Sequence, residues 1–254
     1  MKLTTRNLSV SIGDVNVCRG LDLAIVAGSR WAILGVNGVG KTTLLTTLAG
    51  LRPPDDGEIL LDDIALAGLP PRERARRLGL MAQEDSFHIS DPETTALEVA
   101  LLGRLPHLEW WRGESAHDVQ LAHTALAAVG LNDIAHRRTT MLSGGERRRL
   151  ALAALLAQEV PLCLLDEPNS HLDLHQQMAF MDLLIGWDGR TLVMTLHDVN
   201  IAARYCTHVL LLFGEGQWSA GTVQDMLSAD VLTRLYRHPV IAVDTAQGVA
   251  YLPR

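Results

Sequence analysis

The sequence has few cysteines, few aromatic residues and no long apolar run. Its three cysteines, Cys18, Cys163 and Cys206, are an odd number, lie far apart and contain no C-x-x-C pair. This pattern fits a reducing compartment, and it fits neither a disulfide framework nor a zinc knuckle. The longest uninterrupted apolar stretch, residues 150–157, is eight residues long, whereas a membrane-spanning helix needs about 20. We therefore expect no segment that crosses a bilayer by itself.

Positive charge is also scarce. The chain has 22 Lys and Arg residues against 29 Asp and Glu residues, a formal net charge of -7, so no net positive field is available to hold a nucleic-acid backbone. The first ten residues contain no apolar stretch like that of a signal peptide, which predicts a cytoplasmic protein. Apolar residues, in contrast, make up 48% of the 254 positions. That proportion is enough to bury a substantial core and excludes a disordered chain.

Four short apolar runs predict a largely parallel, doubly wound α/β sheet. They do not alternate polar and apolar residues, as is typical of strands buried on both faces, and helix-length segments separate them. The runs lie at residues 31–34, 162–165, 191–196 and 209–213. Residues 3–26, by contrast, alternate around a Gly13-Asp14 turn and predict a pair of antiparallel strands.

Residues 85–158 contain no such strand, and we expect a helical insertion there. Helix-forming residues with apolar repeats at three and four occur at 95–102, 116–129 and 146–159. The predicted organisation is a nucleotide-binding core of residues 1–84 and 159–254, with residues 85–158 as a helical subdomain. One further helical pattern runs from Val223 to Tyr236.

A glycine-rich loop follows the first of the buried runs. Residues 35–42, GVNGVGKT, match the pattern G-x-x-x-x-G-K-[ST] between a predicted strand and a predicted helix. Glycines let successive backbone N–H groups turn inward around a phosphate, Lys41 reaches the β- and γ-phosphates, and Thr42 can ligate Mg²⁺. The residues predicted to bind nucleotide here are Gly35, Val36, Asn37, Gly38, Val39, Gly40, Lys41, Thr42 and Thr43.

Two carboxylates, Asp166 and Glu167, end the apolar run at 162–165. If there were no phosphate loop, a strand that merely leaves the core through a polar turn would be the favoured explanation of these carboxylates. Beside such a loop, an Asp at a strand end can hold Mg²⁺, and the adjacent Glu can orient or deprotonate a water molecule that attacks the γ-phosphate. Nucleotide hydrolysis is therefore the leading chemistry.

A third motif, LSGGE at residues 142–146, precedes a basic helical stretch. Ser143, Gly144 and Gly145 would present a second helix N-terminus with bare N–H groups, which predicts a second anion site. LSGGE is the signature of the ABC (ATP-binding cassette) ATPases, and the other cassette motifs occur here in that family's order. The sequence resembles one complete cassette. The resemblance implies a P-loop NTPase core, with a mainly parallel sheet and an antiparallel β part, and an α-helical subdomain.

The resemblance assigns further roles. Gln83 is similar to the Q-loop glutamine near Mg²⁺ and the attacking water, residues 170–173 resemble the D-loop, and His197 is similar to the switch histidine that contacts the γ-phosphate. ATP and Mg²⁺ are the implied cofactors. The implied catalytic residues are Glu167, His197 and Gln83, and the implied metal-binding residues are Thr42, Gln83 and Asp166.

The resemblance also implies partners. ABC cassettes act as head-to-tail dimers, in which the phosphate loop of one copy and the Ser143 motif of the other enclose each ATP. Residues 103–107, 172–176 and 232–240 resemble the ATPases of iron-siderophore, haem and cobalamin importers. Such a subunit lies on the cytoplasmic face of the cell membrane, against a permease that receives substrate from an extracytoplasmic binding protein, and involves no nucleic acid. Export and a non-transport ATPase, such as that of iron–sulfur cluster assembly, remain alternatives.

Two features depart from the family or allow two interpretations. Where cassettes usually have an aromatic residue that stacks on adenine, this chain has Ile12. Because such stacking is worth roughly 1–3 kcal/mol, we expect weaker nucleotide affinity or looser base selectivity. Trp110 and Trp111 either contribute to a groove for a membrane partner or pack inside the helical subdomain.

Two other clusters are expected to have ordinary roles. His171 and His175 could share a helix face at i, i+4, but no carboxylate or cysteine pattern completes a metal-binding set, so we expect no metal site there. The three arginines at 147–149 are expected to form a solvated helix face and not a nucleic-acid patch.

Overall fold

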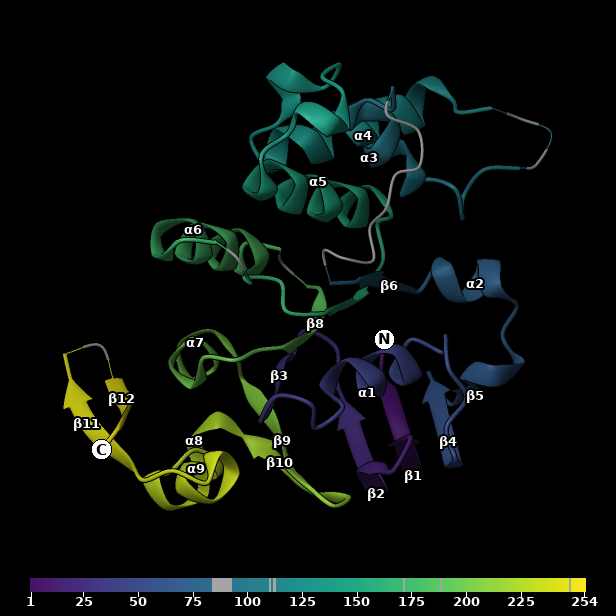
Figure 1. The fold of residues 1–254 in the computed structure, drawn as a ribbon. Coiled ribbons are helices and arrows are strands. Elements are labelled where there is room, and N and C mark those ends of the chain that lie inside the picture. The colour runs from purple at the N-terminus through teal and green to yellow at the C-terminus, as the bar shows by residue number, and fades with distance from the viewer. Residues whose placement is uncertain (84–92, 110, 112, 171, 188, 247) are drawn as a thin grey trace. The chain divides into compact units, whose positions relative to one another are not determined.

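A computed structural model describes residues 1–83, 93–109, 111, 113–170, 172–187, 189–246 and 248–254 (Figure 1). The chain divides into two compact units, each described here by itself. The first consists of Met1–Leu69, Leu164–Glu167 and Gly189–Arg254, and the second consists of Pro70–Cys163 and Pro168–Asp188. The helical subdomain of residues 85–158 stays a prediction, since compactness alone does not define a functional domain.

An antiparallel sheet with the strand order β2-β1-β4-β5 forms the N-terminal part of the first unit (Figure 1, purple and blue). Its strands are β1 (Leu3–Ile12), β2 (Val15–Ile25), β4 (Asp56–Leu61) and β5 (Ile64–Ala65). Gly13, with a φ of 55°, closes the β1–β2 turn because glycine adopts this left-handed conformation without strain. The antiparallel pair predicted from the alternating residues is confirmed.

The same unit contains the parallel strands. They are β3 (Arg30–Gly35), β8 (Thr191–Thr195) and β9 (His208–Gly214). The unit also contains the end of β7 (Leu162–Leu165). A further strand, β10 (Gln217–Thr222), pairs with β9 in the antiparallel direction. β3 pairs in parallel with both β8 and β9, and Ile33 lies opposite Thr195. Parallel strands bring their carboxyl ends to one edge, where ligands bind in α/β proteins. The phosphate loop after β3 and the end of β8 therefore meet at that edge.

Helices and a hairpin complete the first unit. They are α1 (Lys41–Leu48), the short 3-10 helix Leu66–Gly68, α7 (Val199–Tyr205), α8 (Val223–Met226), α9 (Ala229–Tyr236), β11 (Val240–Thr245) and β12 (Gly248–Pro253). The single helix predicted over 223–236 is wrong: α8 ends at Met226 and α9 begins at Ala229. The break occurs because the Ser228 hydroxyl accepts a hydrogen bond from the Val231 N–H, and serine favours such a cap over a helix interior.

The second unit is mainly helical. Its elements are α2 (Pro71–Ala75), β6 (Leu78–Met81), α3 (Ala96–Leu102), α4 (Ala116–Ala128), the 3-10 helices Asn132–Ile134 and Thr139–Met141, α5 (Gly144–Ala157), the start of β7, and α6 (Leu174–Ile185). α3, α4 and α5 each begin with a reciprocal capping box, in which a hydroxyl residue and an acidic residue three positions later bond each other's backbone N–H.

A buried ionic cluster anchors the segment between α3 and α4. The Arg104 guanidinium donates to Asp118 at 3.0 Å and to Glu159 at 2.9 Å, and the Arg104 side chain is only 6% exposed. Gly103 is required beside it, because a Cβ there would lie 2.1 Å from the Ala154 carbonyl oxygen. Part of the sequence that resembles the importer group is therefore an internal anchor of the second unit.

No helix among the described residues is long and apolar enough to span a membrane.

Candidate active site

The phosphate loop joins β3 to α1. Gly40 is the N-cap of α1 with a φ of 99°, and in the described part of the chain no side chain caps this helix. The amides of its first turn are therefore left for a ligand. A Cβ at Gly40 would lie 2.3 Å from Val17 Cγ2, so the loop requires glycine at this position. Gly38 also adopts a positive φ, 78°. The loop is a backbone cradle of the kind that holds a phosphate.

Lys41 lies under this cradle. It is 6% exposed, and its Nζ donates to the carbonyl oxygens of Gly35 at 2.9 Å and Val36 at 3.3 Å. Burial lowers the pKa of its ammonium group, although the negative charges of Glu167 and Asp166 oppose the shift. The ammonium group would bind a phosphate oxygen more strongly than it binds these neutral carbonyl groups, because a hydrogen bond between two charged groups is stronger than one to a neutral acceptor.

Thr195 connects the two carboxylate residues that follow β7. Its hydroxyl donates to Asp166 Oδ1 at 2.6 Å and accepts from the Glu167 N–H at 2.7 Å. Asp166 is 2% exposed and Thr195 is fully buried. Thr195 is not among the site residues predicted from the sequence; the available signal was a hydroxyl residue at the end of a buried strand, two positions before His197.

His197 approaches Glu167 from the loop that precedes α7. Its Nε2 lies 2.6 Å from Glu167 Oε1, with the side chains 47% and 16% exposed respectively. Glu167 itself has a φ of 46°, in the left-handed region that costs a residue of this type about 1–3 kcal/mol. The first unit therefore brings together four of the predicted residues: Lys41, Asp166, Glu167 and His197.

The residues present fit a nucleotide with Mg²⁺. Mg²⁺ prefers hard oxygen ligands and is usually held by one or two protein groups together with phosphates and water. The Asp166 carboxylate and the Thr42 hydroxyl are donors of this type, and the glycine cradle supplies the phosphate site. No group of three or more His, Cys, Asp or Glu residues that could hold a metal by itself occurs in the part of the chain that the structure describes. His171, considered for a metal pair, lies outside the described residues.

The signature motif lies in the second unit, together with Gln83. Ser143 is the N-cap of α5: its hydroxyl accepts from the Glu146 N–H at 3.3 Å, and the Glu146 carboxylate accepts from the Ser143 N–H at 2.8 Å. The predicted set of bare N–H groups is therefore partly wrong, because this capping box already uses one of them, the Ser143 N–H. The amides of Gly144 and Gly145 are those that the helix and its cap do not use.

The arginine triplet at 147–149 is not a solvated face throughout, contrary to expectation. Arg148 is 2% exposed and its Nε donates to the Pro168 carbonyl oxygen at 3.0 Å. A buried guanidinium with a hydrogen-bonded carbonyl has a structural role within this unit.

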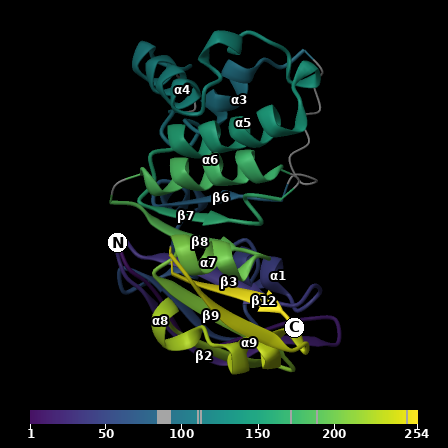
Figure 2. The ribbon, with the colours of Figure 1, turned by 90° about the vertical axis from the view of Figure 1, so that its left-hand side faces the viewer.

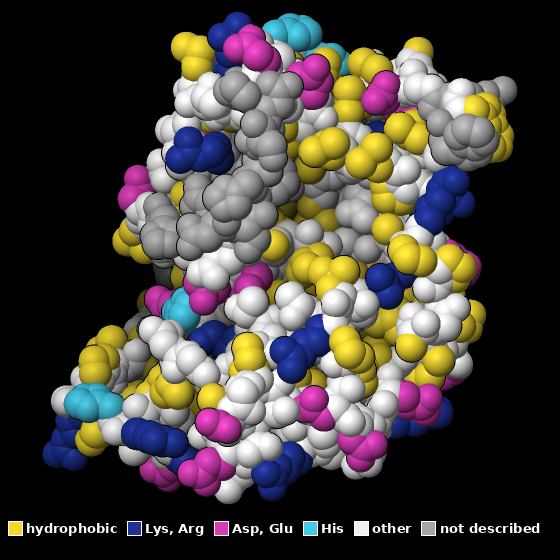
Figure 3. All heavy atoms as spheres, turned by 45° about the vertical axis from the view of Figure 1, so that its right-hand side comes forward, with side chains coloured by type: hydrophobic (Ala, Val, Ile, Leu, Met, Phe, Trp, Pro, Cys, Tyr) yellow, Lys and Arg dark blue, Asp and Glu magenta, His cyan; other side chains and the backbone are white. Residues whose placement is uncertain are grey.

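On the face drawn in Figure 3, the Lys and Arg side chains of the first unit are interspersed with those of Asp and Glu, so that face presents no continuous field of one sign.

Trp111 does not pack inside the second unit. It is 63% exposed, as are Leu102 at 48% and Leu105 at 56%. The backbone beside Leu105 is held in place, since the Pro106 carbonyl oxygen accepts hydrogen bonds from Arg72 and Arg76 of the α2 segment at 2.9 and 2.7 Å. Trp110 lies outside the described residues. The second unit therefore exposes three apolar side chains, those of Leu102, Leu105 and Trp111.

Comparison with known proteins decides the family. The profile of the family described as ABC transporter matches residues 18–170. The chain belongs to this family. It is 36% identical over 238 residues to the siderophore transport system ATP-binding protein YusV of Bacillus subtilis, a match that covers 92% of this chain and 85% of the relative. It is 40% identical over 226 residues to the hemin import ATP-binding protein HmuV of Nocardia farcinica, covering 88% and 77%.

Solved structures agree. An inward-facing ABC transporter described as of the metal-chelate type matches with a TM-score of 0.85 and 28% identity, covering 99% of this chain and 97% of that one. A dimeric ATP-binding cassette bound to ADP and phosphate matches with a TM-score of 0.74 and 26% identity, covering 87% and 98%. The predicted P-loop ABC ATPase fold is confirmed. ABC import subunits hydrolyse ATP to drive transport, and this chain is an ATPase.

Proposed function

We propose that this chain is the ATP-hydrolysing subunit of an importer that takes up a metal chelate of the iron-siderophore, haem or cobalamin type through a membrane permease. The names of its relatives support this class, because a siderophore system and a hemin importer both match over most of the chain. Iron–sulfur cluster assembly, the non-transport alternative, is not favoured by these matches. The cargo need not touch the chain, since the permease and binding protein would carry it.

The 2.6 Å contact between His197 and Glu167 is the observation on which the proposed mechanism rests. The phosphate loop and Lys41 bind the β- and γ-phosphates. Thr42, Asp166 and Gln83 would hold Mg²⁺, which would supply positive charge to neutralise the phosphates. Glu167 accepts a proton from the attacking water as the water oxygen bonds to the γ-phosphorus. The bond from that phosphorus to the β–γ bridging oxygen breaks, and the bridging oxygen stays with ADP.

His197 contacts the γ-phosphate in this proposal. Its imidazole also fixes the Glu167 carboxylate, so one side chain orients both the base and the group under attack. Placing reacting groups in this way accounts for a large part of the catalysis of phosphoryl transfer.

A second copy of the chain would complete the site. The Gly144 and Gly145 amides and the Ser143 hydroxyl of one copy would contact the ATP held by the phosphate loop of the other, in a head-to-tail dimer. Each triphosphate then lies between two helix N-termini, both of which favour negative charge. Loss of the γ-phosphate removes much of that attraction and lets the dimer open.

The remaining partners follow from the transport role. Residues 85–158 would form the helical subdomain, and its exposed apolar side chains Leu102, Leu105 and Trp111 would contact the permease, because exposed apolar groups that gather on a surface mark interaction sites. In this proposal the chain lies in the cytoplasm, at the cytoplasmic face of the cell membrane. An extracytoplasmic binding protein would act only through the permease.

An affinity pull-down tests the transport assignment. Tagged chain is recovered from detergent-solubilised membranes and from the soluble fraction of its native cell, and co-purifying proteins are identified by mass spectrometry. We expect a multi-spanning permease from the membrane fraction. Recovery of a soluble assembly scaffold, with no membrane protein, would leave the ATPase in place and overturn the transport role. Bait carrying Trp111→Ser is the matched control, since it should recover less of the same permease.

A further inference from the structure

The side chain of Asn200 bonds α7 to the C-terminal hairpin of β11 and β12. Asn200 Oδ1 accepts from the Tyr251 N–H at 2.7 Å, and Asn200 Nδ2 donates to the Tyr251 carbonyl oxygen at 3.1 Å. The amide thus satisfies both backbone groups of one strand residue, as a neighbouring strand would. Figures 1 and 2 both draw the hairpin, in yellow, beside α7, and the two elements are in contact.

Asn200 also fixes the start of α7. Its backbone N–H donates to Asp198 Oδ1 at 2.7 Å, which caps the helix. Asp198 directly follows His197, and the Thr195 side chain that ends β8 is bonded to Asp166. The His197 backbone is therefore held on one side by β8 and on the other by the Asn200 contacts.

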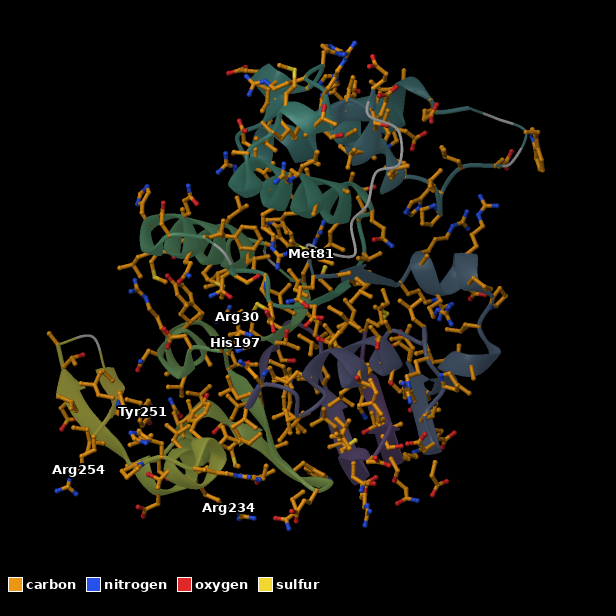
Figure 4. All side chains as sticks on the ribbon, in the orientation of Figure 1. Arg30, Met81, His197, Arg234, Tyr251 and Arg254 are labelled. Atoms are coloured by element: carbon orange, nitrogen blue, oxygen red, sulfur yellow. The ribbon has the colours of Figure 1, made fainter. Side chains whose placement is uncertain are left out.

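The hairpin itself has further attachments. The Tyr251 hydroxyl donates to the Leu227 carbonyl oxygen at 2.8 Å, and the Val240 N–H donates to the Thr233 hydroxyl at 2.9 Å. It is thus a fixed support against which α7 can be held. Figure 4 labels His197 beside α7 and Tyr251 on the hairpin.

The space around His197 is not closely packed on the hairpin side. A cavity of about 410 Å³ lies there, lined by His197, Asp198, Tyr236 and Tyr251 among others. The Tyr236 hydroxyl is buried with no hydrogen-bond partner in the described structure. Where side chains do not fill the space, directional hydrogen bonds determine the position of a segment.

We propose that Asn200 is a positioning residue for His197: its paired hydrogen bonds to Tyr251 hold the start of α7, and so hold the imidazole against the Glu167 carboxylate. This inference rests on the proposed role of His197 in ATP hydrolysis. Asn200 touches neither nucleotide nor Glu167 in this proposal and acts only through the loop that contains His197.

The test compares kcat with ATP affinity. In the purified full chain, Asn200→Ala and the isosteric Asn200→Asp should each lower the single-turnover rate of ATP hydrolysis by about tenfold, because a small misplacement of a reacting group has effects of this size or larger. The Kd for ATP should stay within about twofold, since the phosphate loop is untouched. Unchanged turnover in both variants would overturn the proposal. Asn132→Ala, which removes a side-chain contact to His123 in the second unit, is the matched control.

A double-mutant cycle separates positioning from general destabilisation. If Asn200 acts through His197, then Asn200→Ala should cause no further loss in a His197→Ala background. The same fold-loss in both backgrounds would show that Asn200 acts in another way and would refute the inference.

Hydrogen exchange distinguishes failure of this inference from failure of the proposed function. Asn200→Ala should speed exchange of the Tyr251 amide and of the first amides of α7, whatever happens to catalysis. Unchanged exchange there overturns the positioning role. Normal turnover in His197→Ala would instead overturn the proposed function of His197. Faster exchange in Asn200→Ala would then show only that Asn200 holds the hairpin to α7.

Discussion

His197 Nε2 lies 2.6 Å from Glu167 Oε1, although the two residues follow different strands and are 30 positions apart in the chain. Each is held from its own side. The Glu167 N–H donates to the Thr195 hydroxyl, and His197 lies two residues beyond Thr195. One buried threonine thereby helps to set the distance between Glu167, the proposed base, and His197, the residue proposed to contact the γ-phosphate.

Glu167→Gln should lower ATP turnover by about 10²- to 10⁴-fold, the usual contribution of a general base. The amide keeps the shape of the carboxylate but cannot accept the proton of water. ATP binding should survive, and an ATP-bound dimer should accumulate. Phosphate release and size-exclusion chromatography with ATP and Mg²⁺ measure the two effects, and near-normal turnover would remove Glu167 from the base role.

Nucleotide selectivity should be loose. Ile12 is 45% exposed at the end of β1, and Val15, opposite it on β2, is 40% exposed, so this hairpin presents aliphatic groups where the family usually presents an aromatic ring. The Kd values for ATP and GTP should lie within about tenfold of each other, and Ile12→Tyr should tighten ATP binding by up to roughly 1–3 kcal/mol. A strong preference of the unaltered chain for ATP would contradict this expectation.

Trp111→Ser should weaken binding of the permease without changing the thermal stability of the purified chain. The indole is 63% exposed, so its removal costs little packing within the second unit. Co-purification with the permease and the Tm of the isolated chain are measured together. An equal loss of both would show that Trp111 has a packing role.

The stability of the second unit should fall at low pH through Asp118. The Ser115 hydroxyl bond, with help from Arg104, lowers the pKa of this carboxyl to about 2. Because the folded pKa lies below the ordinary one, the stabilisation is fully present above about pH 4 and is lost as the pH falls through about 2.

Urea unfolding monitored between about pH 5 and pH 2.5 should therefore show a decline in the free energy of unfolding. The Asp118→Asn variant should be less stable than the unaltered chain at about pH 5. Its free energy of unfolding should also decline less steeply as the pH falls, because the amide does not titrate. Parallel curves for the two proteins would mean that Asp118 is not responsible for the loss.

The sequence by itself determined the local features. Residues 31–34 and 162–165 are uninterrupted apolar runs, and both are buried strands. The glycine pattern at 35–42 required a loop between strand and helix, because Gly38 and Gly40 need positive φ angles. Such features depend on neighbours a few positions away, so a single chain displays them without its tertiary structure.

Only the tertiary structure decided which distant groups meet. Nothing near Thr195 in sequence indicates that its hydroxyl connects Asp166 to the Glu167 backbone, and nothing near Asn200 indicates Tyr251, 51 positions away. Arg148 looked like part of an exposed basic face, yet it is buried against a carbonyl group. Hydrogen bonds of this kind depend on the register of strands and the placement of helices, which the whole chain sets when it packs its core.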